Sequence, residues 1–369
     1  MNIKRIGSIA AIAIAGAVVL SSCAANEGGA GSTSSASASG VDYSKLSGTL
    51  TASGSSAQQT AETVWGTGFQ DQASGVTVNY SPDGSGAGRK NFISGAADFA
   101  GSDAALSDEE LAGTFANCAA DSKAIDIPVY ISPIAIAFKV DGVKDLTLDA
   151  KTIAGIFSGK ITKWDDSQIA DLNKDAKLPS ANITVVHRSD DSGTTQNFSE
   201  YLSANAGDVW TEAPSQTFPY QVGDGAAKGS GVASAMQGAT NAITYIDDSG
   251  AGDLDKAKLM VGDKATELSA DGAAKVVADS ETVSGRETND LAIDINRKDT
   301  AEGAWPLVLV SYAIACQEYK DADKADLVKS YLTYVVSDDA QKAAATEAKS
   351  AALSSDLGKK AADAVASIK

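Results

Sequence analysis

Histidine and cysteine are nearly absent from this chain of 369 residues. His187 is its single histidine, and its three cysteines are Cys23, Cys118 and Cys316. Zinc sites are built from clusters of cysteine and histidine ligands, and so few of these residues cannot supply one. We therefore expect neither a metal site nor a cofactor.

Basic residues are also scarce. The chain has 30 Lys and Arg residues against 48 Asp and Glu residues, so its formal net charge is -18. A chain this acidic is repelled by the phosphate backbone of nucleic acids, and no nucleic-acid partner is expected. A small anionic ligand is not excluded, because backbone dipoles and one arginine decide the potential of a local site.

The N-terminus has the pattern of an export signal. Lys4 and Arg5 precede the apolar stretch Ile6–Leu20, which small residues follow. A charged start, a short apolar core and a small-residue end are typical of a secretory signal peptide, and the stretch is short for a membrane span. We assign residues 1–22 to this signal peptide.

The segment Leu20-Ser21-Ser22-Cys23 resembles a bacterial lipobox, in which the cysteine thiol receives diacylglycerol and becomes the new N-terminus. Two or more acyl chains hold a protein stably at a bilayer. We therefore predict that Cys23 is lipidated and that residues 23–43, rich in Ala, Ser and Gly, form a flexible tether. The expected location is the extracytoplasmic face of the cell membrane. An ordinary signal peptide with a chance cysteine is the alternative.

Two cysteines, Cys118 and Cys316, remain in the rest of the chain. In an exported protein such a pair is more often a disulfide than a metal site, so we predict a disulfide, with two buried free thiols as the alternative. The folded part, roughly residues 44–369, exceeds what one hydrophobic core usually supports. Two domains are therefore expected.

The folded part alternates strand-like and helix-like segments, which indicates an α/β fold. The expected strands are Gly48–Thr51, Val76–Tyr80, Ile125–Tyr130, Ile134–Val140, Ile183–Arg188, Ala242–Ile246 and Pro306–Ile314. The expected helices are Ala57–Gln70, Gly88–Ser94, Thr195–Ser203 and Gly231–Gln237. The stretch from Ala325 onward is rich in good helix formers and is expected to be mainly helical.

Three expected strands each lead into a turn, rich in Gly and Ser, that opens a helix. The turns are Ser53-Gly54-Ser55-Ser56, Asp83-Gly84-Ser85-Gly86-Ala87-Gly88 and Ser189-Asp190-Asp191-Ser192-Gly193-Thr194. The first amides of a helix lack intrahelical partners and carry positive potential, and glycine lets an anion approach the backbone. Three such turns predict an oxyanion held by converging helix ends, although serine is also the ordinary helix N-cap.

Two charged residues mark the expected site. Arg188 ends the strand before the third turn, and its guanidinium can bind two oxygens of a tetrahedral anion. A surface salt bridge with Asp190 or Asp191 is the alternative. Asp103 follows an apolar segment, and its carboxylate can accept the proton that phosphate, unlike sulfate, still carries near neutral pH. The alternative is that Asp103, like Asp108, merely caps the helix expected at Asp108-Glu109-Glu110.

Several segments together resemble the phosphate-binding subunit of bacterial phosphate ABC transporters, within the type II periplasmic-binding-protein superfamily. They are Gly84–Gly88, Asp98–Asp103 with Leu106–Asp108, Gly159–Asp166 and Ile183–Thr194. The resemblance extends from about Gly48 to the end of the chain. It implies a two-lobed α/β fold with a hinge, in which residues 44–130 and 307–369 form lobe 1 and residues 131–306 form lobe 2.

The resemblance also implies the ligands of a dehydrated phosphate ion between the lobes. They are Ser56, Ala57, Ser85 and Asp103 in lobe 1, and Arg188, Ser192, Gly193 and Thr194 in lobe 2. Trp164 has no ligand role in the family and is expected to pack in the core.

The sequence departs from the family at two places. Where the family often has Thr-Phe-Pro, this chain has Ser56-Ala57-Gln58, which keeps a backbone donor but removes aromatic cover of the site. The usual Asp-Gly-Ser-Gly-Thr reads Asp190-Asp191-Ser192-Gly193-Thr194 here. An inward-pointing Asp191 would lower the affinity for an anion; the alternative is that the turn takes another backbone geometry.

The resemblance implies a monomeric solute-binding protein that delivers inorganic phosphate to the permease and ATPase of an ABC importer. Binding of another oxyanion, such as sulfate or molybdate, is one alternative, and surface sensing or adhesion is another. A serine hydrolase would need Ser85 or Ser192 as nucleophile and His187 as base. However, His187 and Arg188 are strand neighbours whose side chains point to opposite faces. We therefore expect a binding protein and not an enzyme.

Overall fold

The computed structural model describes residues 43–369, which belong to one compact unit. The predicted signal peptide, Cys23 and all but the last residue of the predicted tether lie outside the described residues. Tyr43, the first residue described, is buried against Phe69. Among the helices of residues 43–369, none combines the length and the apolar character required to cross a bilayer.

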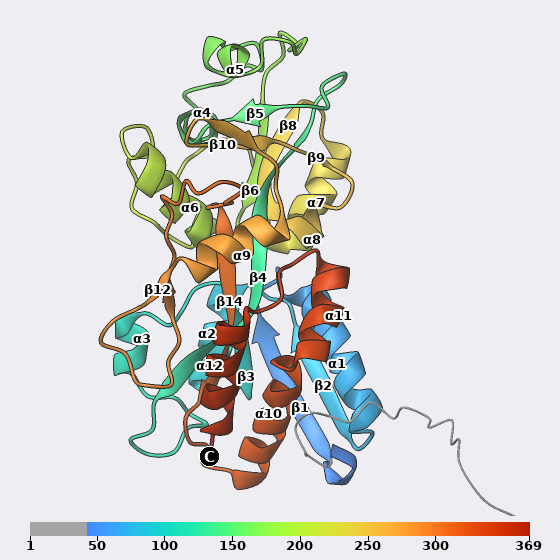
Figure 1. The fold of residues 1–369 in the computed structure, drawn as a ribbon, viewed down its shortest axis with the longest axis vertical. Coiled ribbons are helices and arrows are strands. Elements are labelled where there is room, and N and C mark those ends of the chain that lie inside the picture. The colour runs from blue at the N-terminus through green and yellow to red at the C-terminus, as the bar shows by residue number, and fades with distance from the viewer. Residues whose placement is uncertain (1–42) are drawn as a thin grey trace, which may run out of the picture. The chain divides into compact units, whose positions relative to one another are not determined.

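A curled sheet of nine strands connects two lobes, one below the other in Figure 1. Its strand order is β2-β1-β3-β14-β4-β8-β6-β7, with β9 beside β4. The strands of this sheet are β1 (Gly48–Gly54), β2 (Val76–Ser81), β3 (Phe99–Ser102), β4 (Ala124–Lys139), β6 (Thr184–Arg188), β7 (Asp224–Ala226), β8 (Ala242–Asp247), β9 (Asp255–Lys256) and β14 (Val308–Cys316). We call the part with β1, β2 and β3 lobe 1 and the part with β6, β7 and β8 lobe 2.

Strand β4 runs through both lobes as one continuous element. Its residues 124–133 pair with β14, and its residues 134–139 pair with β8. The sequence predicted two strands here, separated around Ser132 and Pro133, and that prediction is wrong. Proline fits an extended backbone, and the next amide, of Ile134, donates to the Leu307 carbonyl, so the strand continues. All but the last residue of β4 are buried, which explains its nearly unbroken apolar sequence.

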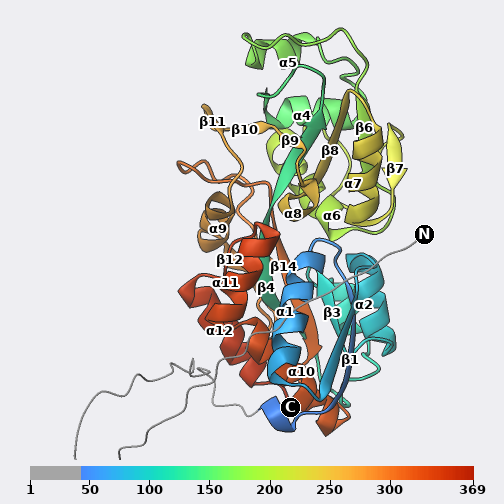
Figure 2. The same ribbon diagram turned by 90° about the vertical axis from the view of Figure 1, so that its right-hand side faces the viewer.

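Lobe 1 is built from parallel strand–helix–strand units. Strand β1 pairs in parallel with β2 and β3. The helices of this lobe are α1 (Gln59–Gln72), α2 (Ser85–Ser94), α3 (Asp108–Ala112), α10 (Ala322–Val335), α11 (Asp338–Ala348) and α12 (Ser355–Ala366), after a short 3-10 helix at Tyr43–Lys45. Helices α10 and α11 pack beside α1, and α12 packs against α10 and β4, so both ends of the chain contribute to this lobe (Figure 2).

Lobe 2 repeats the same kind of unit, with β6 parallel to β7 and β8. Its helices are α4 (Ala150–Phe157), α5 (Ser167–Leu172), α6 (Gly193–Ala206), α7 (Lys228–Gly238), α8 (Asp248–Ala251) and α9 (Ala270–Ala278). Small accessory strands are β5 (Thr147–Leu148), β10 (Lys258–Val261), β11 (Lys264–Thr266), β12 (Glu281–Thr282) and β13 (Ile293–Asp294). Trp164 is fully buried and donates to the Asn241 carbonyl, which confirms its packing role.

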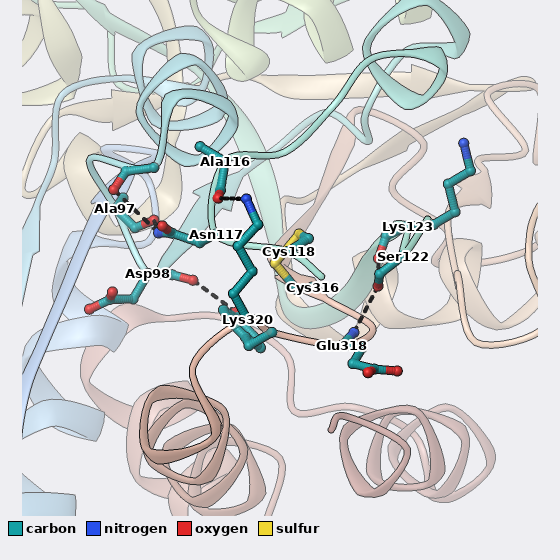
Figure 3. The surroundings of a disulfide bond; sticks show 12 residues. Ala97, Asp98, Ala116, Asn117, Cys118, Ser122, Lys123, Cys316, Glu318 and Lys320 are labelled. Atoms are coloured by element: carbon teal, nitrogen blue, oxygen red, sulfur yellow. Dashed lines mark hydrogen bonds between the residues drawn. A yellow bond between two sulfur atoms is a disulfide. The ribbon is translucent and has the colours of Figure 1, made fainter. Parts of the chain in front are cut away.

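The predicted disulfide between Cys118 and Cys316 is present. It joins the segment after α3 to the C-terminal end of β14 (Figure 3). Hydrogen bonds flank it on both sides: Lys320 donates to the Ala116 carbonyl, and the Glu318 amide donates to the Ser122 hydroxyl. The crosslink therefore fastens two chain segments of lobe 1 that are distant in the sequence.

Candidate functional site

Asp103 lies where the two lobes meet, directly after β3, and is almost completely buried. Its backbone amide donates to the Ser85 hydroxyl at 3.1 Å. Its carboxylate accepts hydrogen bonds from Ser311 at 2.6 Å and, across the lobes, from Thr194 at 3.1 Å. Burial raises the pKa of Asp103 above its ordinary value, against the lowering effects of Ser311, Arg188 and Thr194. The buried carboxylate therefore depends on these hydrogen-bond donors and on Arg188 to stay ionised.

The N-termini of two helices meet beside Asp103. Ser85 is the first residue of α2 in lobe 1, and Gly193 is the first residue of α6 in lobe 2. A Cβ atom added to Gly193 would lie 2.7 Å from both Ser85 Oγ and Asp103 Cβ, so only glycine permits this approach. Ser192 caps α6 by accepting a hydrogen bond from the Thr195 amide at 3.2 Å. The positive ends of two helix dipoles thus adjoin the same carboxyl group.

Arg188 supplies the positive charge of the site. The guanidinium is buried and donates to both oxygens of Asp190, at 2.7 and 2.6 Å. Asp190 also accepts from the Lys228 amide, so it holds the guanidinium in a fixed orientation. Burial alone would raise the pKa of Asp190, but Arg188 keeps it lowered. A Cβ atom added to Gly84 would lie 3.6 Å from one guanidinium nitrogen of Arg188. The guanidinium therefore lies next to the start of α2.

The first predicted turn meets lobe 2 at a different helix. The Ser56 hydroxyl accepts a hydrogen bond from the Gly229 amide, at the start of α7, at 3.0 Å. The Ala57 amide donates to the Ser55 hydroxyl at 3.1 Å. A side-chain hydrogen bond from Ser55 also lowers the pKa of Asp103. Ser55 and not Ser56 is therefore the hydroxyl of this turn that acts on Asp103.

The structure brings most of the expected residues together. Ser85, Asp103, Arg188, Gly193 and Thr194 are linked by the contacts above, and Ser192 caps the helix that Gly193 and Thr194 begin. Ser56 and Ala57 lie on the lobe 1 turn that carries Ser55.

The additional carboxylate at Asp191 points away from the site. It accepts from Lys90 of lobe 1 at 2.9 Å and from Thr217 at 3.1 Å, and its side chain is 44% exposed. Lys90 keeps the pKa of Asp191 below its ordinary value. The departure from the family motif therefore adds a solvated ion pair between the lobes and places no second charge beside Arg188.

His187 is placed as its strand position predicts. The imidazole stacks on Phe218 with 4.0 Å between ring centroids, and its Nδ1 lies 2.8 Å from the Arg188 carbonyl. Arg188, the next residue, turns instead to Asp190. Within residues 43–369, neither Ser85 nor Ser192 is hydrogen-bonded to this histidine, so the nucleophile–base pair of a serine hydrolase is not formed there.

Sequence reasoning missed four residues around Asp103: Ser55, Gln58, Asn197 and Ser311. Gln58 donates to the Ser311 hydroxyl at 2.7 Å, and Ser311 in turn donates to Asp103. Asn197 donates to the Asp103 carbonyl at 2.7 Å. Ser311 stands as a polar residue within an apolar strand sequence, which was an available signal. Gln58 occupies the position where the family has proline, which was a second signal.

Comparisons with known proteins agree with this geometry. The sequence model of a family described as PBP superfamily domain matches residues 28–339. Phosphate-binding protein PstS 3 of Mycobacterium tuberculosis (strain ATCC 25618 / H37Rv) is 36% identical over 340 residues, 90% of each chain. Phosphate-binding protein PstS 2 of the same strain is 34% identical over 341 residues, again 90% of each chain.

Solved structures share the fold. A high affinity periplasmic phosphate-binding protein, PfluDING, superposes with a TM-score of 0.70 at 23% identity, covering 85% of this chain and 92% of that chain. The phosphate binding protein of Stenotrophomonas maltophilia gives a TM-score of 0.66 at 20% identity, covering 86% and 94%. The predicted two-lobed, periplasmic-binding-protein-like α/β fold is confirmed. The chain therefore belongs to the PBP superfamily and, within it, to the family of the PstS phosphate-binding proteins.

Proposed function

We propose that this protein captures inorganic phosphate between its lobes and delivers it to an ABC permease for import. The observation that carries this proposal is the buried carboxyl group of Asp103 beside Arg188 and two helix N-termini. The positive groups attract the anion, and the carboxylate accepts a hydrogen bond only from an anion that carries a proton. The family relationship supports the same ligand, because its relatives are named phosphate-binding proteins.

The proposed contacts follow from the chemistry of each group. Arg188 meets two phosphate oxygens on the side of the guanidinium not occupied by Asp190. Backbone amides and hydroxyls at the two helix ends meet the remaining oxygens. The proposed ligand set is Ser56, Ala57, Ser85, Asp103, Arg188, Ser192, Gly193 and Thr194, with Ser55 added.

Asp103 sets the proposed preference for phosphate. Each carboxylate oxygen has two acceptor positions, so each can still accept a hydrogen bond beside those from Ser311 and Thr194. Phosphate near neutral pH supplies a proton to one of these positions. Sulfate has none, so its charge would face the carboxylate without a compensating hydrogen bond. Sites of this kind reject analogues that lack the polar hydrogen by about 10⁴–10⁵.

We further propose that the lobes, with the boundaries predicted from the sequence, close on phosphate about a hinge where the chain crosses between them, near residues 130–132 and 306–311. The protein then acts as a monomeric carrier and not as an enzyme. Lipidation of Cys23 would keep it at the extracytoplasmic face of the membrane, near the permease and its ATPase. Co-purification with these subunits from detergent-solubilised membranes tests the transport role separately from phosphate binding.

The ligand is tested by calorimetry with phosphate and sulfate on the native chain and on the variant Asp103→Asn. The amide of the variant can donate to sulfate, so the ratio of sulfate to phosphate dissociation constants should fall by about 100-fold or more. Asp108→Asn, at an exposed position in the first turn of α3, is the matched control and should leave the ratio unchanged. Equal losses of both ligands in Asp103→Asn would remove Asp103 from the specificity, and tighter binding of sulfate or molybdate by the native chain would contradict the proposed ligand.

A further inference from the structure

Asn197 forms a buried hydrogen bond between the lobes at the residue proposed to recognise the phosphate proton. It lies one turn into α6 and is 3% exposed. Its side-chain amide donates to the Asp103 carbonyl at 2.7 Å and to the Gly193 carbonyl at 2.9 Å. The first bond crosses from lobe 2 to lobe 1, and the second secures the first residue of α6. One side chain therefore joins the two polypeptide segments whose contact closes the site.

Arg297 fixes the orientation of this amide. Its guanidinium is 8% exposed and donates to the Asn197 side-chain oxygen, to Glu200 of α6 at 2.7 Å and to the Val308 carbonyl at the start of β14. A guanidinium can only donate, so the Asn197 oxygen must face Arg297 and its NH2 group must face the two carbonyls. We refer to Asn197 and Arg297 together as the clasp.

The clasp also lines a cavity beside Asp103. A cavity of about 600 Å³ is lined by Asp103, Asn197 and Arg297, together with Gln196 and Gln216. Asp103 and Asn197, the two ends of the hydrogen bond across the lobes, thus both line this cavity. Breaking that bond would let the lobes part on the side of the cavity, where water can replace the lost hydrogen bonds.

We propose that Asn197, oriented by Arg297, is a positioning residue that sets the rate of phosphate release by joining the lobes at Asp103. This inference rests on the proposed function, because the clasp acts on the phosphate site. Asn197 donates only to backbone carbonyls and accepts from Arg297, so it contributes nothing to the recognition of the anion itself. Its hydrogen bond to the Asp103 carbonyl forms once the lobes meet, so it opposes opening and leaves the capture of phosphate unaffected.

The test separates release from capture. The native chain and the variants Asn197→Ala and Arg297→Lys are loaded with radiolabelled inorganic phosphate and chased with unlabelled phosphate, and uptake rates are measured in parallel. Removing the Asn197 amide deprives the buried Asp103 carbonyl of this donor only when the lobes are closed, so release should become about 10- to 100-fold faster. Uptake should stay within about threefold of the native rate. Arg297→Lys should accelerate release by a smaller factor, because the ammonium group of lysine cannot reproduce the planar set of hydrogen bonds that the guanidinium makes to Asn197, Glu200 and Val308.

Asn173, which follows α5 in lobe 2, provides the matched control. Its side-chain amide donates to the carbonyls of Thr147 and Ile169, and neither bond reaches Asp103 or Arg297. Asn173→Ala should release phosphate at the native rate, and thermal unfolding without phosphate checks that all variants fold. If Asn197→Ala releases phosphate as slowly as Asn173→Ala, or if uptake and release are accelerated equally, the proposed role of the clasp is refuted. A native chain that binds no phosphate would instead refute the proposed function, and the clasp with it.

Discussion

Replacing Gly193 by alanine should weaken phosphate binding without destabilising the protein. The added methyl group would lie 2.7 Å from Asp103 Cβ and Ser85 Oγ and 3.0 Å from the Asp103 carbonyl carbon. All three contacts are with lobe 1, so the clash arises only when the lobes meet. The amide of residue 193 is retained, so the proposed phosphate ligand is not lost. Any loss of affinity therefore reports on closure.

The magnitude follows from the cost of inserting one carbon atom into a tightly packed contact, about 1–3 kcal/mol. At tenfold in affinity for each 1.4 kcal/mol, the phosphate dissociation constant should rise about 5- to 150-fold. Alanine favours the helix more than glycine does, so the free energy of unfolding without phosphate should be unchanged or raised by up to about 1 kcal/mol.

Calorimetry gives the affinity, and thermal unfolding without phosphate gives the stability. Gly231→Ala in α7 is the matched control, because its Cβ would lie at an ordinary 3.7 Å from Ala226 Cβ. A Gly193→Ala variant that binds phosphate as tightly as the native chain would refute the close approach of α6 to Asp103.

Three further predictions concern the buried carboxyl group of Glu62, the disulfide and Asp191, where the sequence departs from the family. Burial raises the pKa of Glu62 from 4.5 to about 7, so between these pH values the folded state keeps a proton that the unfolded state releases. The free energy of unfolding should therefore fall by up to about 3 kcal/mol as pH rises through this window, and chemical denaturation of Glu62→Gln should lack this component. Replacing Cys118 and Cys316 by serine should lower the free energy of unfolding by about 2–5 kcal/mol with little change in phosphate affinity; an equally stable variant would contradict a structural role for the disulfide. Asp191→Asn should change phosphate affinity less than about fivefold at any salt concentration, because its ion pair with Lys90 is exposed; a large gain in affinity would mean that the carboxylate faces the ligand.

Local sequence patterns predicted the strands better than the helix starts. The expected strand Val76–Tyr80 is β2, Val76–Ser81. Helix α2 was expected from Gly88 but begins at Ser85, since its glycines argue against a helix by intrinsic propensity. In the fold, a Cβ on Gly88 would lie 2.5 Å from the Gly54 Cα, so glycine is needed for α2 to pack on β1. Tertiary packing overrides propensity at this point.

The anion-binding groups could be expected from the sequence because strand–turn–helix units place them at helix ends. The buried side chains that surround Asp103 could not. Asn197 and Gln58 lie within or beside helices whose sequences give no sign of which face meets the segment of Asp103. Gln58 reaches Asp103 only through Ser311, a residue more than 250 positions away in the sequence. Such contacts depend on how segments distant in the sequence are placed in the fold, which local patterns do not encode.

The most direct test is titration of the phosphate-stripped native protein with inorganic phosphate, followed by the same titration in excess sulfate. One phosphate should bind per chain, and about a thousandfold excess of sulfate should leave the affinity nearly unchanged. An absence of binding, or displacement of phosphate by equimolar sulfate, would contradict the claim that Asp103 and Arg188 form a site for a protonated oxyanion.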